Sequence, residues 1–141
     1  MNNAEPKITP DAPCPCTSEK DYSSCCGQYI GTKVNAPTAE ALMRTRYTAY
    51  VLCDMDHLVK SIPLHHRKAF DQRAATLWSK SAEWLGLEVL SSKEYEQGKK
   101  ARVEFKARYK IENEEQNHHE IAIFEKVQDR WFFVDSKMLQ N

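Results

Sequence analysis

The chain has 141 residues, and its 20 Lys and Arg residues balance its 20 Asp and Glu residues, so the formal net charge is zero. This length suits one domain with a small appendage, and the charge balance argues against a protein that holds nucleic acid through a general excess of cations. The hydrophobic fraction of 41% allows a folded core, but no apolar run is long enough to cross a membrane.

The first 34 residues differ in composition from the rest. Residues 1–13 lack the apolar run of a secretory signal and the arginines of a transit peptide, so we expect a cytoplasmic protein with a disordered N-terminal tail. Residues 1–34 contain almost no aliphatic side chains, whereas apolar residues recur periodically from residue 35 onward. The sequence therefore predicts a small metal-dependent knuckle at 1–34 and one globular domain at 35–141.

Four of the five cysteines lie in the knuckle, as the pairs Cys14/Cys16 and Cys25/Cys26. Zinc is bound tetrahedrally by four thiolates in structural sites, and two close pairs joined by an eight-residue loop can supply them. A disulfide within either pair would be strained, although bridges between the pairs remain geometrically open. Because cytoplasmic thiols stay reduced, we favour a closed zinc site formed by these four cysteines. Lys20 lies either beside the thiolates or in solvent.

Three helices are expected in the first half of the globular domain. Thr38 is placed to cap a helix that runs to about residue 52. A short helix follows at 55–61, before Pro63. Apolar residues at helical spacing then predict a third helix over 70–85 that stops at Gly86, and its stripe consists of Phe70, Ala74, Leu77, Trp78, Ala82 and Leu85.

The spacing of apolar residues changes to two from Leu87 onward. Residues 99–111 alternate apolar and charged side chains over their whole length, which is typical of a strand with one buried face. Further strands are predicted at 87–91, 121–127 and 131–134, with a polar turn at 112–117. Three helices followed by a four-stranded antiparallel meander predict an α+β fold with the helices on one face of the sheet.

The cysteine pattern resembles a known module. Cys-x-Cys-x8-Cys-Cys, with Pro13 before it and Gly27 after it, is similar to the SEC-C motif, a zinc-binding module found at the C-terminus of the SecA translocation ATPase. The usual Gly-Ser-Gly after the second cysteine is replaced here by Thr17-Ser18-Glu19. All four ligands that the motif implies are present, so the departure concerns the shape of the loop.

The rest of the chain resembles the YchJ family of small bacterial proteins. The similarity rests on residues 37–50 (PTAEALMRTRYTAY), 103–109 (VEFKARY) and 130–135 (RWFFVD). The resemblance implies an N-terminal SEC-C motif followed by an NTF2-like domain, in which a curved sheet wraps round a long helix as a cone and often leaves a cavity.

Such a cavity would be lined by the aromatic residues of the helices and strands. The candidates are Tyr47, Tyr50, Trp78, Phe105, Tyr109 and Trp131, with Asp135, Asp56 and Arg46 as polar groups. Each aromatic residue also fits plain core packing, which is the more common role for this spacing. Cys53 is expected to be a small buried apolar side chain.

The functional expectation is a non-enzymatic, zinc-binding interaction protein of the cytoplasm. The resemblance to the SecA module implies a protein partner, such as a chaperone or a ribosome-associated protein. One alternative is a small-molecule binding protein or enzyme that uses the cavity. Another is an RNA binder, because the polar side of residues 100–110 carries five cations and one carboxylate, although Glu88, Glu94 and Glu96 can pair with them.

Overall fold

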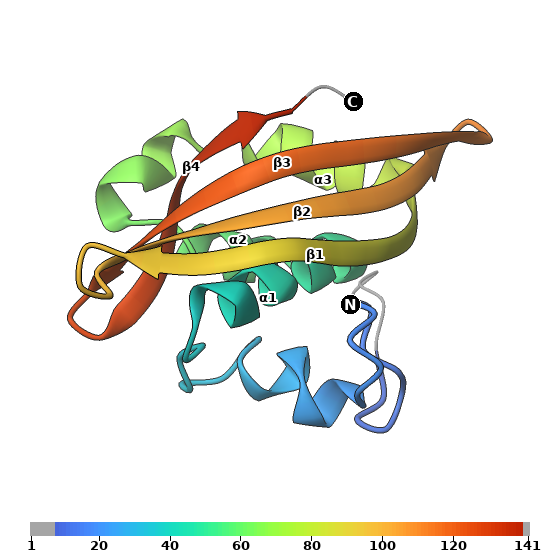
Figure 1. Cartoon of the computed structure of the whole chain (residues 1–141). Helices are drawn as coiled ribbons and strands as arrows, with labels where there is room; N and C mark the ends of the chain where they lie inside the picture. Colours follow the sequence, from blue (N-terminus) through green and yellow to red (C-terminus); the bar gives the residue numbers. More distant parts are fainter. Residues whose placement is uncertain (1–7, 140–141) are drawn as a thin grey trace.

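Four strands form a single antiparallel sheet in the order in which they follow one another in the chain. In the computed structural model, which describes residues 8–139, the strands are β1 (Glu83–Tyr95), β2 (Lys100–Ile111), β3 (Glu114–Val127) and β4 (Arg130–Met138). The sheet curves over the helices that precede it (Figure 1). This arrangement confirms the predicted α+β fold; residues 1–7 of the expected N-terminal tail lie outside the described residues.

The alternation in β2 places its apolar side chains on the inner face of the sheet. Ala101, Val103, Phe105 and Ala107 are all buried, whereas Arg102 is exposed on the outer face. The connection between β2 and β3 is only Glu112–Asn113, not the longer polar turn expected from composition. Both of these residues have positive φ, as in the tight two-residue hairpins that match the strand twist.

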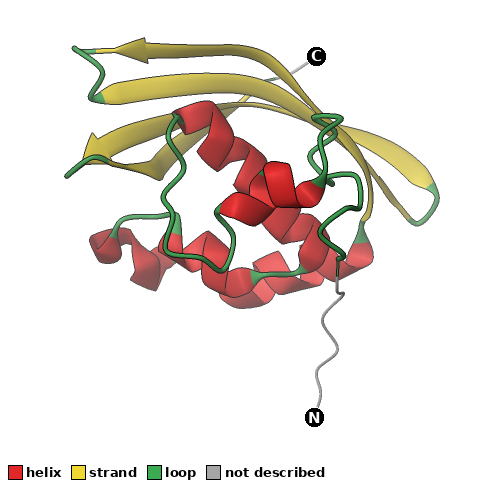
Figure 2. Cartoon of the chain, turned by 90° about the horizontal axis from the view of Figure 1, so that it is seen from below, coloured by secondary structure: helices red, strands yellow, loops and turns green. Residues whose placement is uncertain are grey.

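The helices cover the inner face of the sheet (Figure 2). They are α1 (Ala39–Leu52), α2 (Met55–Lys60) and α3 (Gln72–Ser81), with a 3-10 segment η3 (Leu64–Ala69) between the last two. The predicted N-cap of α1 is confirmed, because the Thr38 side chain accepts a hydrogen bond from the amide of Ala41. Within residues 8–139, every helix is too short or too polar to span a membrane.

Helix α1 is buried on two sides. One side packs on the sheet, and the other carries the N-terminal module (residues 8–34), which lies beneath α1 in Figure 1. The module contains the 3-10 turns η1 (Tyr22–Ser24) and η2 (Cys26–Gln28). For this reason every residue of α1 from Thr45 to Ala49 is buried, including three polar ones. One continuous apolar cluster contains module, helix and sheet residues.

The prediction of a third helix over residues 70–85 was wrong at both ends. The side chain of Asp71 accepts a hydrogen bond from the amide of Ala74, so α3 begins after Phe70. Trp84 belongs to β1, where it pairs with Tyr109, and Gly86 lies inside that strand rather than ending a helix. Leu77 of the supposed buried stripe is 69% exposed. The apolar residues at 84–85 therefore belong to the sheet and not to a helix.

Candidate metal centre

The four cysteines of the module come together at one point. The Sγ atoms of Cys14, Cys16, Cys25 and Cys26 all lie within 4.8 Å of one another, and all but Cys25 are buried. Tetrahedral zinc–thiolate geometry separates the sulfur atoms by about 3.8 Å. The distance from Cys16 Sγ to Cys25 Sγ is 3.6 Å, and all four thiols are unbridged. The cluster therefore has the size and the donor atoms of a four-thiolate metal site.

Short backbone contacts fold the module around these sulfurs. The amide of Cys14 donates to the carbonyl of Lys20, and that of Cys25 donates to the carbonyl of Tyr22. At Gly27 a Cβ atom would lie 2.7 Å from the carbonyl oxygen of Tyr22, closer than real Cβ contacts allow. The glycine after the second cysteine pair is therefore required by this close approach.

The loop after Cys16 departs from the SEC-C pattern at two residues with left-handed backbone. Thr17 has φ 60° and Glu19 has φ 73°, a region that favours glycine and costs most for a β-branched residue. The Thr17 hydroxyl bonds to the backbone of Leu87 in β1, 2.8 Å from its carbonyl oxygen and 3.1 Å from its amide. These bonds join the module directly to the sheet and offset the backbone strain.

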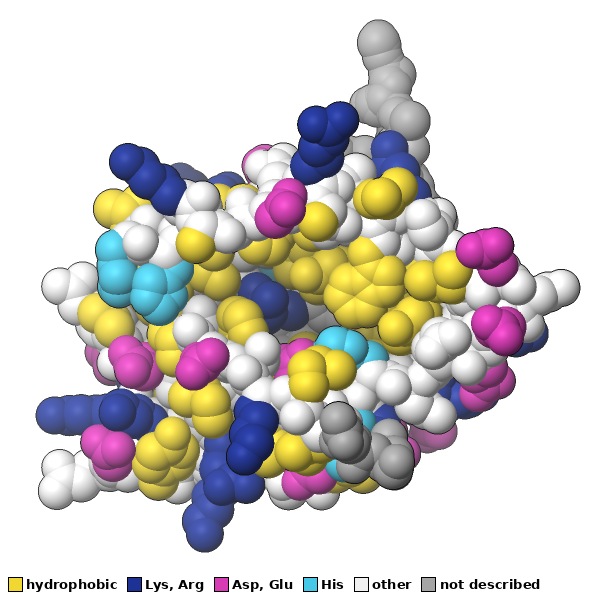
Figure 3. Space-filling view, turned by 90° about the horizontal axis from the view of Figure 1, so that it is seen from above, with side chains coloured by type: hydrophobic (Ala, Val, Ile, Leu, Met, Phe, Trp, Pro, Cys, Tyr) yellow, Lys and Arg dark blue, Asp and Glu magenta, His cyan; other side chains and the backbone are white. Residues whose placement is uncertain are grey.

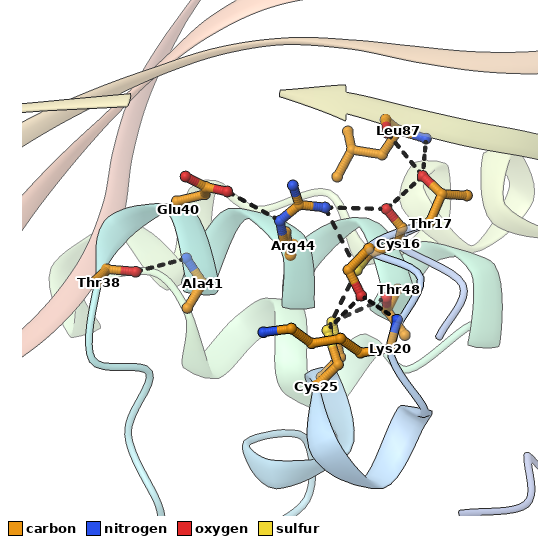
Figure 4. Close-up of polar contacts among 12 residues, drawn as sticks. Cys16, Thr17, Lys20, Cys25, Thr38, Glu40, Ala41, Arg44, Thr48 and Leu87 are labelled. Atoms are coloured by element: carbon orange, nitrogen blue, oxygen red, sulfur yellow. Dashed lines mark hydrogen bonds and ion pairs between the residues drawn. The ribbon is translucent and has the colours of Figure 1, made fainter. Parts of the chain in front are cut away.

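Helix α1 supplies polar groups to the sulfur atoms (Figure 4). The hydroxyl of Thr48 donates to Cys26 Sγ at 3.3 Å, and the guanidinium of Arg44 lies 3.7 Å from Cys16 Sγ and 3.2 Å from the Cys16 carbonyl oxygen. Within the module, Ser18 Oγ lies 3.2 Å from Cys25 Sγ. Such second-shell donors orient thiolate ligands and offset their charge.

The ionisation of the thiols reflects this crowding. The pKa of Cys16 is lowered by hydrogen bonds from the thiols of Cys14 and Cys26, and further by Ser18 and Arg44. The pKa of Cys26 is raised by its hydrogen bonds to Cys14 and Cys16 and by burial. One thiolate is thus already favoured within the cluster, which is the form that binds a metal.

Thr48 and Arg44 were not among the residues expected at the site. They follow the last cysteine of the cluster, Cys26, by 18 and 22 residues and are one helical turn apart on α1. The one signal that the sequence offers for them is their spacing of four residues, which places both side chains on the same face of the helix. Lys20 is exposed, and Figure 4 shows its side chain passing along the open side of Cys25.

Most of the predicted pocket residues meet on the inner face of the sheet. Tyr50 and Trp78 have ring centroids 5.2 Å apart, and Trp78 lies 5.6 Å from Tyr109. Trp84 joins the group at 5.7 Å from Tyr47. Phe105, 4% exposed, reaches the same group through His118, which lies 6.1 Å from Phe105 and 5.5 Å from Trp78. The missed members are Trp84 and His118.

Two of the polar pocket candidates, Asp135 and Asp56, lie apart from these aromatic rings. Asp135 is exposed and pairs in register with Ile123, and it shares a shallow outer depression with Arg102 and Lys93. Asp56 is also exposed. It lines a different pocket together with Trp131, which is 2% exposed. Cys53 is half-buried at the C-terminal end of α1, beside the apolar cluster of Ala49, Met55, Leu58 and Ala75.

The cations on the outer face of β2 have acidic neighbours. Arg108 forms an ion pair with Glu115 at 3.0 Å, and Lys100 forms one with Glu96 at 3.5 Å. Glu88 lies opposite Lys106 in the register, as expected, but Glu94 lies opposite Ala101 and not opposite a cation. The cross-strand pairing predicted from sequence is therefore confirmed in part.

Comparison with known proteins agrees with the fold and with the cysteine cluster. A solution structure of a SEC-C motif-containing protein from Rhodopseudomonas palustris superimposes with a TM-score of 0.82 at 38% identity, covering 90% of this chain and 98% of that one. A crystal structure of a sec-c motif protein from Psychrobacter arcticus gives 0.79 at 31% identity, covering 94% and 85%.

Sequence comparison places the chain more narrowly. A UPF0225 protein of Haemophilus influenzae (strain PittEE) is 41% identical over 122 residues, which cover 86% of this chain and 76% of that protein. A UPF0225 protein of Geobacter sulfurreducens is 38% identical over 123 residues, covering 86% and 76%. The family model described as the middle NTF2-like domain of YchJ matches residues 38–136, and on this ground the chain belongs to the YchJ family.

Proposed function

We propose that the protein is a zinc-binding protein in which Cys14, Cys16, Cys25 and Cys26 hold one structural zinc ion. The observation that carries the proposal is the convergence of four sulfur atoms within 4.8 Å, three of them on buried residues. Four thiolates select zinc over harder divalent cations, and zinc favours their tetrahedral arrangement. When bound, zinc supplies cross-linking between the two cysteine pairs.

The chain's own residues limit what such an ion can do. A catalytic zinc keeps one coordination position for water or substrate, whereas four protein ligands close the site. Thr48 and Arg44 further occupy the side of the cluster that faces α1. These contacts support a structural role in which the metal keeps the module folded against α1.

We further propose that the folded module serves as a protein-binding surface in the cytoplasm. The support is the resemblance to the SEC-C module of SecA, together with the closed metal site, which leaves the metal no catalytic position. The partner we expect is a chaperone or a ribosome-associated protein. In this proposal zinc acts indirectly, by maintaining the shape of the surface that the partner contacts.

Metal analysis of paired cysteine variants tests the zinc assignment. Protein purified under reducing conditions should contain one zinc per chain, and Cys16→Ser should contain less than a fifth of that. Cys53→Ser is the matched control, because Cys53 lies outside the cluster, and it should keep full metal content. Full zinc content in Cys16→Ser, or iron in place of zinc in the unmodified chain, would refute the assignment.

The partner proposal has a separate test. Binding partners captured from cytosol should be retained by Cys53→Ser and lost by Cys16→Ser. Equal capture by both variants would contradict a partner surface that depends on the metal, while leaving the zinc assignment intact.

A further inference from the structure

The structure buries one arginine without an ionic partner. Arg46, in the middle of α1, is 7% exposed, and none of the ion pairs within residues 8–139 includes it. Its guanidinium donates to the hydroxyl of Ser61 and lies 4.0 Å above the ring of Phe133. A guanidinium has five N–H donors, and buried charges are normally paired. Arg46 therefore has unused capacity to bind an anion.

A hollow opens on the face of the molecule where η3 and α3 approach β3 and β4. Figure 3 shows this hollow with a Lys or Arg side chain at its floor, hydrophobic side chains on its walls, and acidic and histidine side chains beside it. Arg46 is buried on this side of α1, against the ring of Phe133 of β4, and Tyr50 and Glu120 lie near enough to affect its pKa. Tyr50 follows Arg46 by one helical turn, so both side chains project from the same side of α1.

Aromatic rings continue this wall from α1 across to β3. Tyr50 contacts Trp78 with ring centroids 5.2 Å apart, and Trp78 lies 5.5 Å from His118 of β3. Tyr50, Trp78 and His118 are only partly buried, unlike ordinary core residues. An apolar or aromatic ligand body can pack against such rings.

The second buried charge is already engaged by another group. Glu120 is 9% exposed, and its Oε1 lies 2.6 Å from Nε2 of His118, two residues earlier on the same face of β3. Burial lowers the pKa of Arg46, while the nearby Tyr50 and Glu120 oppose that shift. Glu120 therefore acts on Arg46 from beyond ion-pair distance, and the guanidinium still lacks a direct anionic partner.

We propose that this hollow binds a small organic monoanion, a carboxylate with an aromatic or apolar body. Arg46 binds the carboxylate through its free N–H groups, and Tyr50 and Trp78 pack on the body. Arg46 and Glu120 are both buried and act on one another, so a single negative charge suits the site better than the double charge of a phosphate ester. The site is formed by α1, α3 and the sheet, and it does not rest on the zinc proposal.

Titration with three matched probes tests the proposal on the full, zinc-loaded chain. Benzoate, the neutral benzamide and phenyl phosphate are added while the indole N–H signal of Trp78 is followed by NMR. We expect a saturable shift with benzoate and binding at least tenfold weaker with benzamide. No saturable shift with benzoate, or equal binding of benzamide, overturns the proposal. Tighter binding of phenyl phosphate overturns the assignment to a carboxylate.

Substitutions give the second arm of the test. Arg46→Met should weaken benzoate binding at least tenfold, whereas Arg102→Met, on the exposed outer face, should change it less than twofold. Glu120→Gln removes a like charge and should tighten benzoate binding several-fold, which keeps the test decisive if Arg46→Met fails to fold. Unchanged binding in Arg46→Met, or weaker binding in Glu120→Gln, contradicts the site.

Discussion

The sheet and the N-terminal module pack on opposite sides of α1 through different kinds of contact. Toward the sheet, the helix packs on large apolar residues such as Phe105, Phe124 and Trp131, all nearly inaccessible to solvent. On its other side, the helix packs on the N-terminal module, whose buried residues are mainly Cys14, Cys16, Cys26 and Ile30. The first side is stabilised by apolar burial, whereas the second depends on what binds the sulfurs. The comparison indicates that metal loss will affect the two sides unequally.

Metal removal is the most severe way to test this difference. Without zinc, the module should lose its fold, because binding contributes about 10 kcal/mol or more in small zinc modules and the site is not stable alone. Hydrogen exchange before and after chelation should show lost amide protection over residues 14–30 and retained protection in β2 and β3. Equal loss in the module and the sheet would contradict the contrast between the two sides.

A substitution in the sheet should have the opposite pattern. Phe124→Ala removes a fully buried ring and should lower the free energy of unfolding by about 3 to 5 kcal/mol. Val127→Ala, at a side chain that is 51% exposed, is the matched control and should change it by about 0.5 kcal/mol or less. Denaturant unfolding of the zinc-loaded proteins measures both. A loss in Phe124→Ala no greater than that in the control would be inconsistent with a sheet-centred core.

The hydrogen bond from α1 to the cluster connects the two sides. Thr48→Val keeps the shape of the side chain but removes the hydroxyl that donates to Cys26 Sγ. Losses of second-shell partners lower metal affinity by about 10- to 100-fold, and we expect a change in that range. Competition with a zinc chelator measures it, with Thr76→Val of α3 as control, since Thr76 bonds only within its own helix. An unchanged affinity would show that α1 does not support the site.

The smallest expected effect concerns the loop that departs from the SEC-C pattern. Glu19→Gly relieves an exposed residue with φ 73° and should stabilise the module by about 0.5 to 1 kcal/mol. Lys20→Gly, at an ordinary backbone conformation next to it, should destabilise the module slightly. Local hydrogen exchange of residues 14–30 compares the two. If Glu19→Gly destabilises the module as Lys20→Gly does, the left-handed backbone at Glu19 is not under strain.

Features that repeat along the chain could be predicted from sequence. The alternation over residues 99–111 identified β2 and its buried face, and the cysteine spacing identified the cluster. Other features depend on what lies opposite a residue in space. Trp84 and Leu85 continue a helical pattern in the sequence, yet they pack in β1, because Asp71 and the end of α3 at Ser81 fix the helix elsewhere.

The polar residues of α1 show the same limit. Arg44 and Thr48 face the sulfurs, while Arg46, between them, faces the hollow. From the sequence, Arg46 was expected as a polar group of a cavity, but no role was assigned to Arg44 or Thr48. Burial on both sides of the helix gives these polar residues their roles, and their spacing alone does not show what each side packs against.

X-ray absorption at the zinc edge tests the central claim most directly. The account predicts one zinc ion with four sulfur neighbours at about 2.3 Å and no nitrogen or oxygen ligand, in the unmodified chain and in Cys53→Ser alike. A nitrogen or oxygen neighbour in the first shell, or fewer than four sulfurs, would contradict a closed site formed by Cys14, Cys16, Cys25 and Cys26.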